Sequence, residues 1–244
     1  MSLNCLKKII KKIIFPNTYS SEAYIMHLKK CGVDIGEHCY VWSPNHTMID
    51  TQRPEMLHIG DYCKITQGVI ILSHDYSVSV AKRVYHEHIG NCAETVIGNN
   101  VFIGMNAIIL MGSKIGDNCI VGAGSVVSGT FPCNSVIAGN PAKVICSLED
   151  FYKKHKEREV SEAKNYYLEF KRKHNRIPKI EEMGNAFAWL YLPRTQESVN
   201  RYSSFFHLSG DNETETVDDF LKSKPVFSGY EEFYAFAEGE KRND

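Results

Sequence analysis

Aliphatic residues return at every sixth position over much of the first 146 residues of the chain. The buried face of a helix repeats about every 3.6 residues and that of a half-buried strand about every second residue, so this period fits neither element. It fits short strands joined by corners and stacked as the coils of a solenoid, with the recurring aliphatic side chain pointing inward. The hexapeptides open at Ile35, Val41, Ile59, Ile65, Ile71, Ile97, Ile103, Ile109, Ile115, Val121 and Val127.

Two further hexapeptide positions are restricted. The second position holds a glycine, which tolerates the backbone angles of a corner, at Gly36, Gly60, Gly98, Gly104, Gly116 and Gly122. The fifth holds a small residue, which fits a narrow inner angle, at Cys39, Cys63, Ala107, Ser113, Cys119 and Ser125. Because free cysteine packs as a small hydrophobic residue, the three cysteines of this set are predicted to belong to the core.

The period breaks twice. In TMIDTQRPEML, Arg53 stands where an aliphatic residue is expected, which predicts a short excursion. After Ile71 the next hexapeptide opens 26 residues later, at Ile97, which is two residues more than four hexapeptides. We therefore predict a loop of roughly residues 75–94 that leaves the column.

The sequence ILSHDYS places His74 at the root of this loop. In a regular hexapeptide Asp75 would point into the aliphatic column, where an unpaired carboxylate is too costly to leave ionised. The chain is therefore expected to leave the coil at about His74. Ser73, His74 and Asp75 do not form a triad, because neighbours on a strand point to opposite faces.

These hexapeptides resemble those of the left-handed β-helix hexapeptide-repeat acyltransferases. Together with the segment SVIAGNPAKVI at 135–145, they resemble the branch of maltose, galactoside and capsular-polysaccharide O-acetyltransferases. The resemblance covers roughly residues 33–146. It implies a mainly β fold, a left-handed parallel β-helix. It also implies a homotrimer with active sites between subunits, and direct acetyl transfer from acetyl-CoA without a metal or an acyl-enzyme.

The same resemblance assigns two catalytic roles. His74 matches the general base that accepts the proton of an acceptor hydroxyl. Imidazole has a reference pKa of ~6.5, and such assistance is typically worth ~10²–10⁴-fold in rate. The amide of Met105, in FIGMN, matches the position that meets the thioester oxygen, where a backbone donor would stabilise the developing oxyanion.

The resemblance also implies cofactor contacts, at Phe102, Gly104, Ala123, Gly124 and Lys143. Ala123 and Gly124 match positions along the pantetheine arm, and Lys143 matches a basic residue facing the CoA phosphates. Two departures stand out. Phe102 replaces a tryptophan that many relatives carry, and Gly129 stands where a lysine is common.

Acceptor contacts are implied less directly. Asn45 and Asp50, in PNHTMID, fall near the family's acceptor-binding residues, although the spacing there is irregular. Asp75 is a third candidate for contact with the acceptor, and it is also close enough in sequence to orient the imidazole of His74.

The segment LNCLKKIIKKIIF, residues 3–15, places its apolar side chains opposite Lys7, Lys8, Lys11 and Lys12. This is the pattern of a basic amphipathic helix, which is typical of a segment that lies on a membrane surface or binds a partner. A helix that caps the open end of the β-helix explains the pattern equally well.

The composition changes after Cys146: 13 of the 17 glycines precede it and 17 of the 27 aromatic residues follow it. Ser147 and Asp150 resemble a capping box that opens a long helix, and further helices are predicted near 179–191, 214–223 and 229–238. We predict an N-terminal amphipathic and helical segment (1–32), the β-helix (33–146) and a helical C-terminal extension (147–244). The extension is expected to pack against the β-helix or a neighbouring subunit.

The bulk properties exclude several classes of protein. The chain is 43% hydrophobic and 23% charged with a formal net charge of -1. No basic block with interleaved aromatic residues indicates nucleic-acid binding, and no apolar run reaches the ~18 residues of a membrane span. The eight cysteines include no CxxC pair and are expected to be reduced thiols in a cytoplasm. His86 and His88 are predicted to be solvated loop residues, and no metal is expected.

The sequence therefore predicts an acetyl-CoA-dependent O-acetyltransferase acting on a sugar hydroxyl, in surface-polysaccharide biosynthesis. An acetyltransferase of the chloramphenicol or streptogramin type is an alternative within the same enzyme class. A β-helix that serves as a scaffold without turnover is an alternative of a different class.

Overall fold

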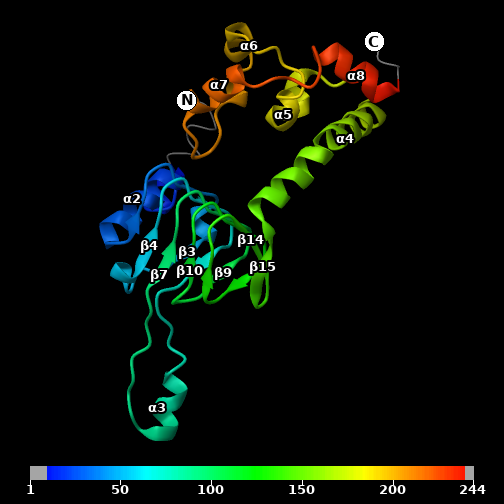
Figure 1. Cartoon of the computed structure of the whole chain (residues 1–244). Helices are drawn as coiled ribbons and strands as arrows, with labels where there is room; N and C mark the ends of the chain where they lie inside the picture. The colour runs from blue at the N-terminus through cyan, green and yellow to red at the C-terminus, as the bar shows by residue number, and fades with distance from the viewer. Residues whose placement is uncertain (1–9, 240–244) are drawn as a thin grey trace. The chain divides into compact units, whose positions relative to one another are not determined.

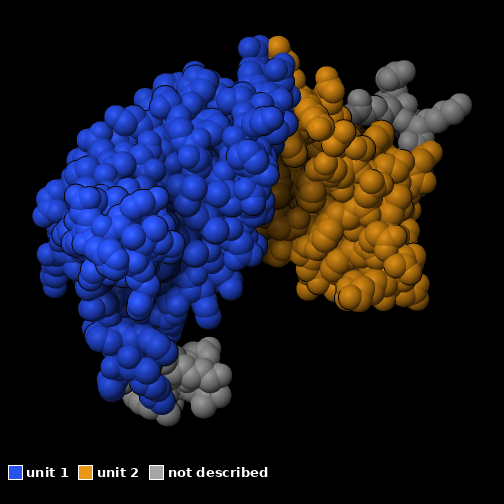
Figure 2. Space-filling model, turned by 90° about the horizontal axis from the view of Figure 1, so that it is seen from below, with its two compact units in different colours: residues 1–151 blue, residues 152–244 orange. Residues whose placement is uncertain are grey.

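The computed structural model describes residues 10–239. The chain forms two compact units that meet in sequence after Phe151, shown in different colours in Figure 2. Each unit has a hydrophobic core of its own.

The first unit is built from three sheets of very short strands (Figure 1). Sheet A contains β1 (Asp34–Ile35), β4 (Leu57–Ile59), β7 (Thr95–Ile97), β10 (Lys114–Ile115) and β13 (Thr130–Phe131). Sheet B contains β2 (Tyr40–Val41), β5 (Lys64–Ile65), β8 (Phe102–Ile103), β11 (Ile120–Val121), β14 (Ser135–Gly139) and β15 (Ala142–Ser147). Sheet C contains β3 (Met48–Ile49), β6 (Ile70–Ile71), β9 (Ile108–Ile109) and β12 (Val126–Val127).

The chain visits sheets A, B and C in turn, and each strand pairs in parallel with its counterpart one coil later. The exception is the final pair, in which β15 turns back antiparallel on β14. The predicted left-handed parallel β-helix is confirmed. Its coils have three corners, which we call A–B, B–C and C–A after the sheets they join.

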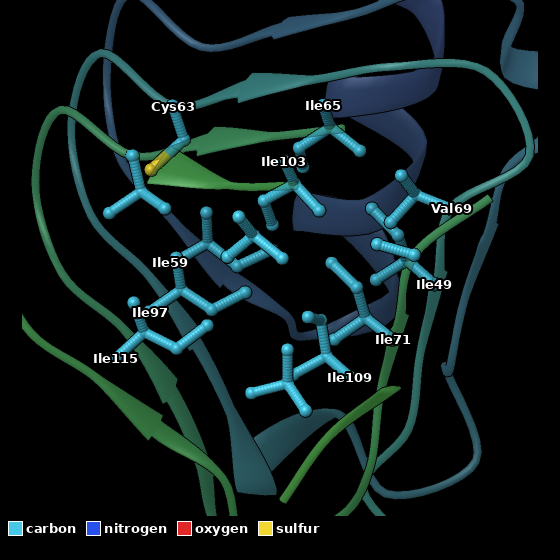
Figure 3. Packing of buried hydrophobic residues seen from close by; sticks show 14 of the residues in the cluster. Ile49, Ile59, Cys63, Ile65, Val69, Ile71, Ile97, Ile103, Ile109 and Ile115 are labelled. Carbon is cyan, nitrogen blue, oxygen red and sulfur yellow. The ribbon is translucent and has the colours of Figure 1, made fainter. Parts of the chain in front are cut away.

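The hexapeptide openings line the axis of the β-helix. Figure 3 shows isoleucines from all three sheets pointing toward one another. Along sheet A, for example, Ile59, Ile97 and Ile115 are in register on successive strands. Burying one such side chain is worth about 1.5–3 kcal/mol, so the column is the main source of stability in this unit.

The predicted core cysteines are confirmed. Cys39, Cys63 and Cys119 are buried. Each thiol also lies within hydrogen-bonding reach of a backbone carbonyl of the adjoining coil, at 3.1 Å from Gly60 O for Cys39 and 3.2 Å from Gly98 O for Cys63.

Helix α2 (Ser21–Cys31) covers the first coil. Its N-cap is Ser20, whose side chain accepts from the amide of Ala23, and its Leu28 and Tyr24 belong to the core of the column. The end of the column is therefore capped by α2. Part of the predicted amphipathic segment, residues 3–9, lies outside the described residues, whereas residues 10–14 are helical.

Both predicted excursions occur at the C–A corner. The first contains the 3-10 helix η2 (Pro54–Met56) between β3 and β4. The second lies between β6 and β7 and carries α3 (Ser79–Tyr85), which projects far from the coils (Figure 1). The sequence predicted this second excursion but not its helix. Another 3-10 helix, η1 (Pro44–His46), occupies the B–C corner between β2 and β3.

The second unit is helical. Its elements are α4 (Leu148–His174), α5 (Ile180–Ala188), α6 (Gln196–Arg201), η3 (Ser203–Phe205), α7 (Glu213–Lys222) and α8 (Tyr230–Glu238). The predicted helix start at Ser147 is confirmed, because the Asp150 amide donates to Ser147 Oγ at 3.0 Å. The second bond differs from that of a capping box, since the Asp150 carboxylate accepts from the Ser147 hydroxyl, at 2.6 Å, and not from its backbone amide. The helices predicted near 179–191, 214–223 and 229–238 are present, and α6 was not predicted.

The helices of the second unit enclose a core rich in aromatic side chains. Its largest fully buried members are Tyr167, Tyr191, Phe206, Phe220, Phe227 and Phe233. The sequence did not predict this separate core, because a pattern of isolated short helices does not reveal which helices pack together. Packing of the extension against the β-helix or a neighbouring subunit stays a prediction.

Candidate active site

His74 lies at the C–A corner, where the chain leaves β6. Its Nδ1 is hydrogen-bonded to Oδ2 of Asp50. Asp50 directly follows β3, the strand that pairs with β6, so the two residues come from adjoining coils. The side chain of His74 is 25% exposed and that of Asp50 is 2% exposed. The imidazole therefore reaches solvent while the carboxylate behind it does not.

The Asp50 carboxylate is held by several donors. Oδ2 accepts from the amide and the hydroxyl of Ser73, at 3.1 and 2.7 Å, and Oδ1 accepts from the amide of Gln52 at 2.9 Å. Burial by itself raises the pKa of Asp50, but the hydrogen bonds from Gln52, Ser73 and His74 outweigh it and lower the pKa to about 2. Asp50 is therefore a buried carboxylate at neutral pH.

An ionised carboxylate can only accept hydrogen bonds, so Nδ1 of His74 carries a proton and donates a hydrogen bond to Asp50. In the neutral imidazole the other ring nitrogen, Nε2, then has a free lone pair. This arrangement fixes both the tautomer and the orientation of the ring, and it leaves Nε2 as a base.

The position of Asp75 corrects one expectation. Its Oδ1 accepts from the amide and hydroxyl of Ser77, at 2.9 and 2.6 Å, and from Nδ2 of Asn91 at 2.9 Å. Asp75 thus ties together the two ends of the α3 excursion, and the residue that orients His74 is Asp50. The near-complete burial of Asp50 also makes it a support for His74, and not a side chain that an acceptor could reach.

The two ends of the α3 excursion are joined to each other beside the His74–Asp50 pair. His74 and Cys92 form an antiparallel bridge, and the amide of Ala93 donates to the carbonyl of Ser73 at 3.1 Å. A cavity of about 490 Å³ opens at this point, lined by His74 and Asp75, by Gln52 and Arg53 from the first excursion, and by Tyr76, His88 and Asn91 from the second. His74 thus stands in the wall of a cavity large enough for a small acceptor.

The proposed cofactor residues gather at a different corner, B–C. The amide of Gly124 donates to the carbonyl of Met105 at 2.8 Å. A Cβ on Gly104 would lie 2.5 Å from the amide nitrogen of Ala123, so only glycine permits this approach of the two coils. Met105, Ala123 and Gly124 therefore lie side by side on successive coils.

Lys143 continues this row. It is exposed on β15 and is the register partner of Ala138 on β14, the strand that follows β11 in sheet B. From β8 to β15 the row crosses three strand spacings, or roughly 14 Å. Phe102 and Met105 expose large parts of their side chains beside it. Gly129, in contrast, lies at the C–A corner with φ of +102°, a conformation that lysine would adopt only with strain.

The structure does not bring every predicted site residue together. Asn45 lies in η1 at the B–C corner, where its side-chain oxygen accepts from the hydroxyl of Thr18. Within one chain, His74 and Met105 stand at the opposite edges of sheet C. About six residues of nearly extended chain separate these two corners on each coil, a distance of up to roughly 20 Å.

His86 and His88 lie on the α3 excursion. Among residues 10–239, the structure contains no group of three or more histidine, cysteine, aspartate or glutamate side chains arranged to hold a metal ion. Over the same range, every helix is too short or too polar to cross a membrane.

Comparison with known proteins identifies the family. A family model described as bacterial transferase hexapeptide (six repeats) matches residues 94–129. Protein CapG of Staphylococcus aureus is 38% identical over 146 residues, which make up 60% of this chain and 81% of CapG. The chain belongs to the bacterial hexapeptide transferases.

Other relatives of this hexapeptide transferase carry more specific names. Galactoside O-acetyltransferase of Escherichia coli strain K12 is 29% identical over 141 residues, covering 50% of this chain and 68% of that protein. A hexapeptide-repeat-containing acetyltransferase from Vibrio cholerae O1 biovar eltor, solved in complex with acetyl-CoA, is 26% identical with a TM-score of 0.39. That match covers 48% of this chain and 60% of the other, so it spans less than two thirds of the solved chain.

The pairing of Asp50 with His74 leads to the first prediction. We expect Asp50→Asn to lower kcat for acetyl transfer by about 10²–10⁴-fold, because an amide can donate to Nδ1 and so favour the wrong tautomer. Steady-state release of free thiol from acetyl-CoA measures the effect. The matched control is Asp34→Asn, which alters an Asp–His pair on sheet A, where Oδ2 lies 3.1 Å from Nδ1 of His58. Equal activity in the two variants would remove Asp50 from the site.

Proposed function

We propose that this protein is an acetyl-CoA-dependent O-acetyltransferase that acts on a sugar hydroxyl in surface-polysaccharide biosynthesis. The observation that carries the proposal is the His74–Asp50 pair in the wall of a cavity, on the fold of a hexapeptide transferase. The relationship to galactoside O-acetyltransferase supports the reaction and a sugar acceptor.

In the proposed reaction, Nε2 of His74 accepts the proton of the acceptor hydroxyl as the hydroxyl oxygen attacks the thioester carbonyl of acetyl-CoA. The carbon–sulfur bond then breaks, the imidazolium returns its proton to the leaving thiolate, and the products are the acetyl ester and free CoA. Asp50 stabilises the imidazolium, because its carboxylate stays ionised throughout. In this proposal the amide of Met105 donates to the oxyanion of the intermediate and stabilises it.

The row of residues at the B–C corner supports binding of acetyl-CoA. Gly104 allows the coils to lie close together, and the turn at Ala123 and Gly124 exposes backbone along the row. Lys143, at the far end, supplies a cation for the phosphates. The length of the row suits an extended arm that carries its reactive end toward Met105 and its phosphates toward Lys143.

The separation of the two corners supports a homotrimer. General-base catalysis requires the base to be within about 3 Å of the proton it accepts, directly or through one water. His74 and Met105 of one chain stand too far apart to act on one acetyl group. In the proposed assembly, the C–A corner of one subunit faces the B–C corner of the next, so each active site takes its base and its cofactor row from different chains.

The N-terminal segment supports a location on the cytoplasmic face of a membrane. In the described part of this segment, Ile13 is 74% exposed and Ile14 is 61% exposed, while Lys11 and Lys12 are also exposed. The alternative role of capping the β-helix is performed by α2. In the proposed arrangement, the apolar side chains enter the lipid interface and the lysines meet anionic headgroups.

The general-base assignment leads to the second prediction. We expect His74→Ala to lower kcat by about two to four decades while leaving the affinity for CoA nearly unchanged, because the imidazole acts on the acceptor proton only. Thiol release with acetyl-CoA and a panel of sugars measures kcat, and calorimetric titration measures CoA affinity. Light scattering serves as the control, since the variant should keep the mass of three chains. Near-normal turnover would end the assignment.

The third prediction concerns Lys143. We expect Lys143→Ala to raise the KM for acetyl-CoA more than it lowers kcat, because the phosphates are remote from the reacting carbon. A charge-assisted contact of ~1.5–3 kcal/mol corresponds to roughly ten- to hundredfold weaker binding. Lys30→Ala, which removes an exposed lysine from α2, is the matched control. Unchanged CoA affinity in the Lys143 variant would exclude this lysine from the site.

The fourth prediction concerns the membrane. We expect the full chain to bind vesicles that contain anionic lipid at low salt and to be released as salt increases, since each lysine near such a surface contributes ~1 kcal/mol that salt screens. Replacing Ile13 and Ile14 by serine should abolish binding without altering the activity or the mass of the assembly. Sedimentation with vesicles measures both effects. A full-length protein that ignores anionic vesicles at low salt would contradict the proposed location.

A further inference from the structure

The helical second unit contains a cavity of about 340 Å³ that the reaction at His74 does not use. Its apolar walls include Trp189, Phe205 and Val226, and its charged groups include Arg194 and Lys224. All the lining residues belong to the second unit. A cavity of this size with largely apolar walls and a few charged groups is the usual form of a small-ligand site.

Arg194 is held rigidly in this cavity. Its guanidinium donates to the carbonyls of Trp189 and Leu192 and to Oγ of Ser223, and it lies 4.4 Å from the ring centroid of Phe220. These bonds use three of its five N–H donors and leave two without a partner in the described part of the chain. The guanidinium is thus fixed in place before any ligand arrives, which reduces the entropy lost on binding.

The charge of Arg194 has no counter-ion in the described part of the chain. Within residues 10–239, no carboxylate lies within 4.0 Å of the charged groups of Arg194 or Lys224. The acid in the lining, Glu159, is already paired with Lys156 at 2.6 Å. Burial lowers the pKa of the Arg194 guanidinium, as expected for a cation withdrawn from water without a partner. The cavity therefore carries an excess of positive charge.

We propose that this cavity binds an acidic sugar unit, with a carboxylate or phosphate group against Arg194 and Lys224 and the sugar ring against Trp189 and Phe205. A planar guanidinium matches the two oxygens of either anion. The aromatic side chains offer flat apolar surfaces to the C–H faces of a sugar ring, and the volume suits a ligand of about one ring. The inference does not depend on the proposed acetyl transfer.

The chain has two tryptophans, and Trp189 is the one in the cavity. In full-length protein carrying Trp42→Phe, tryptophan fluorescence, excited at a wavelength that tyrosine does not absorb, therefore reports on Trp189 alone. We expect glucuronate or glucose 6-phosphate to change this fluorescence saturably, and glucose, the neutral analogue, to leave it unchanged. Comparing the two acids distinguishes a carboxylate ligand from a phosphate ligand.

Two lysine variants test the assigned residues in this background. Lys224→Gln should weaken binding by roughly three- to tenfold, because it removes a partly solvated charge contact. Lys222→Gln, two residues away and outside the cavity, is the matched control and should bind as before. Arg194→Gln should bind still more weakly, with its circular dichroism spectrum verifying the fold. Failure of both acids to bind, equal binding of glucose, or equal affinities of the two lysine variants would overturn the proposal.

Discussion

Parallel pairing of each strand with its counterpart one coil later fixes the register on which the first unit depends. In sheet A, Leu57 pairs with Thr95 and Ile59 with Ile97, so one inward side chain always lies above another. A slip by one residue would turn the whole aliphatic column outward. The same register aligns the corners, and the residues of the candidate site lie on those corners.

The His74–Asp50 pair of the candidate site uses this register at the corner where the chain leaves β6 for the α3 excursion. Ser73 is fully buried two residues after Ile71, and its amide and hydroxyl offset much of the cost of placing Asp50 inside the protein. The same corner then opens into the excursion, so His74 has a rigid, desolvated support on one side and a cavity on the other. The regular coils position Asp50 behind the imidazole and so fix its tautomer, and the excursion that interrupts them leaves the ring open to the cavity.

The sequence predicted the features that depend on local spacing. Inward residues such as Ile97 and Ile103, the small fifth position at Cys63, and the departure of the chain at His74 all follow from a period of six. The sequence placed Asp50 near the site but did not predict its hydrogen bonds to Ser73 and His74, because they depend on how the chain returns to register after the irregular segment around Arg53. The core of the second unit escaped prediction for a related reason. Contacts such as Tyr167 with Phe233 join helices far apart in the chain, and no periodicity encodes them.

The bridge between His74 and Cys92 separates the excursion from the coil that supports it. The strands on either side of the excursion, β6 and β7, are already paired with neighbouring coils. The residues between them therefore contribute nothing to the register of the column. The entropic cost of a flexible loop rises by only about 0.6 kcal/mol for each doubling of its length. The segment from Asp75 to Asn91 is therefore an insertion whose length the β-helix does not constrain. Its length can therefore change at little cost to the column, while the imidazole of His74 and the buried carboxylate of Asp50 stay where they are.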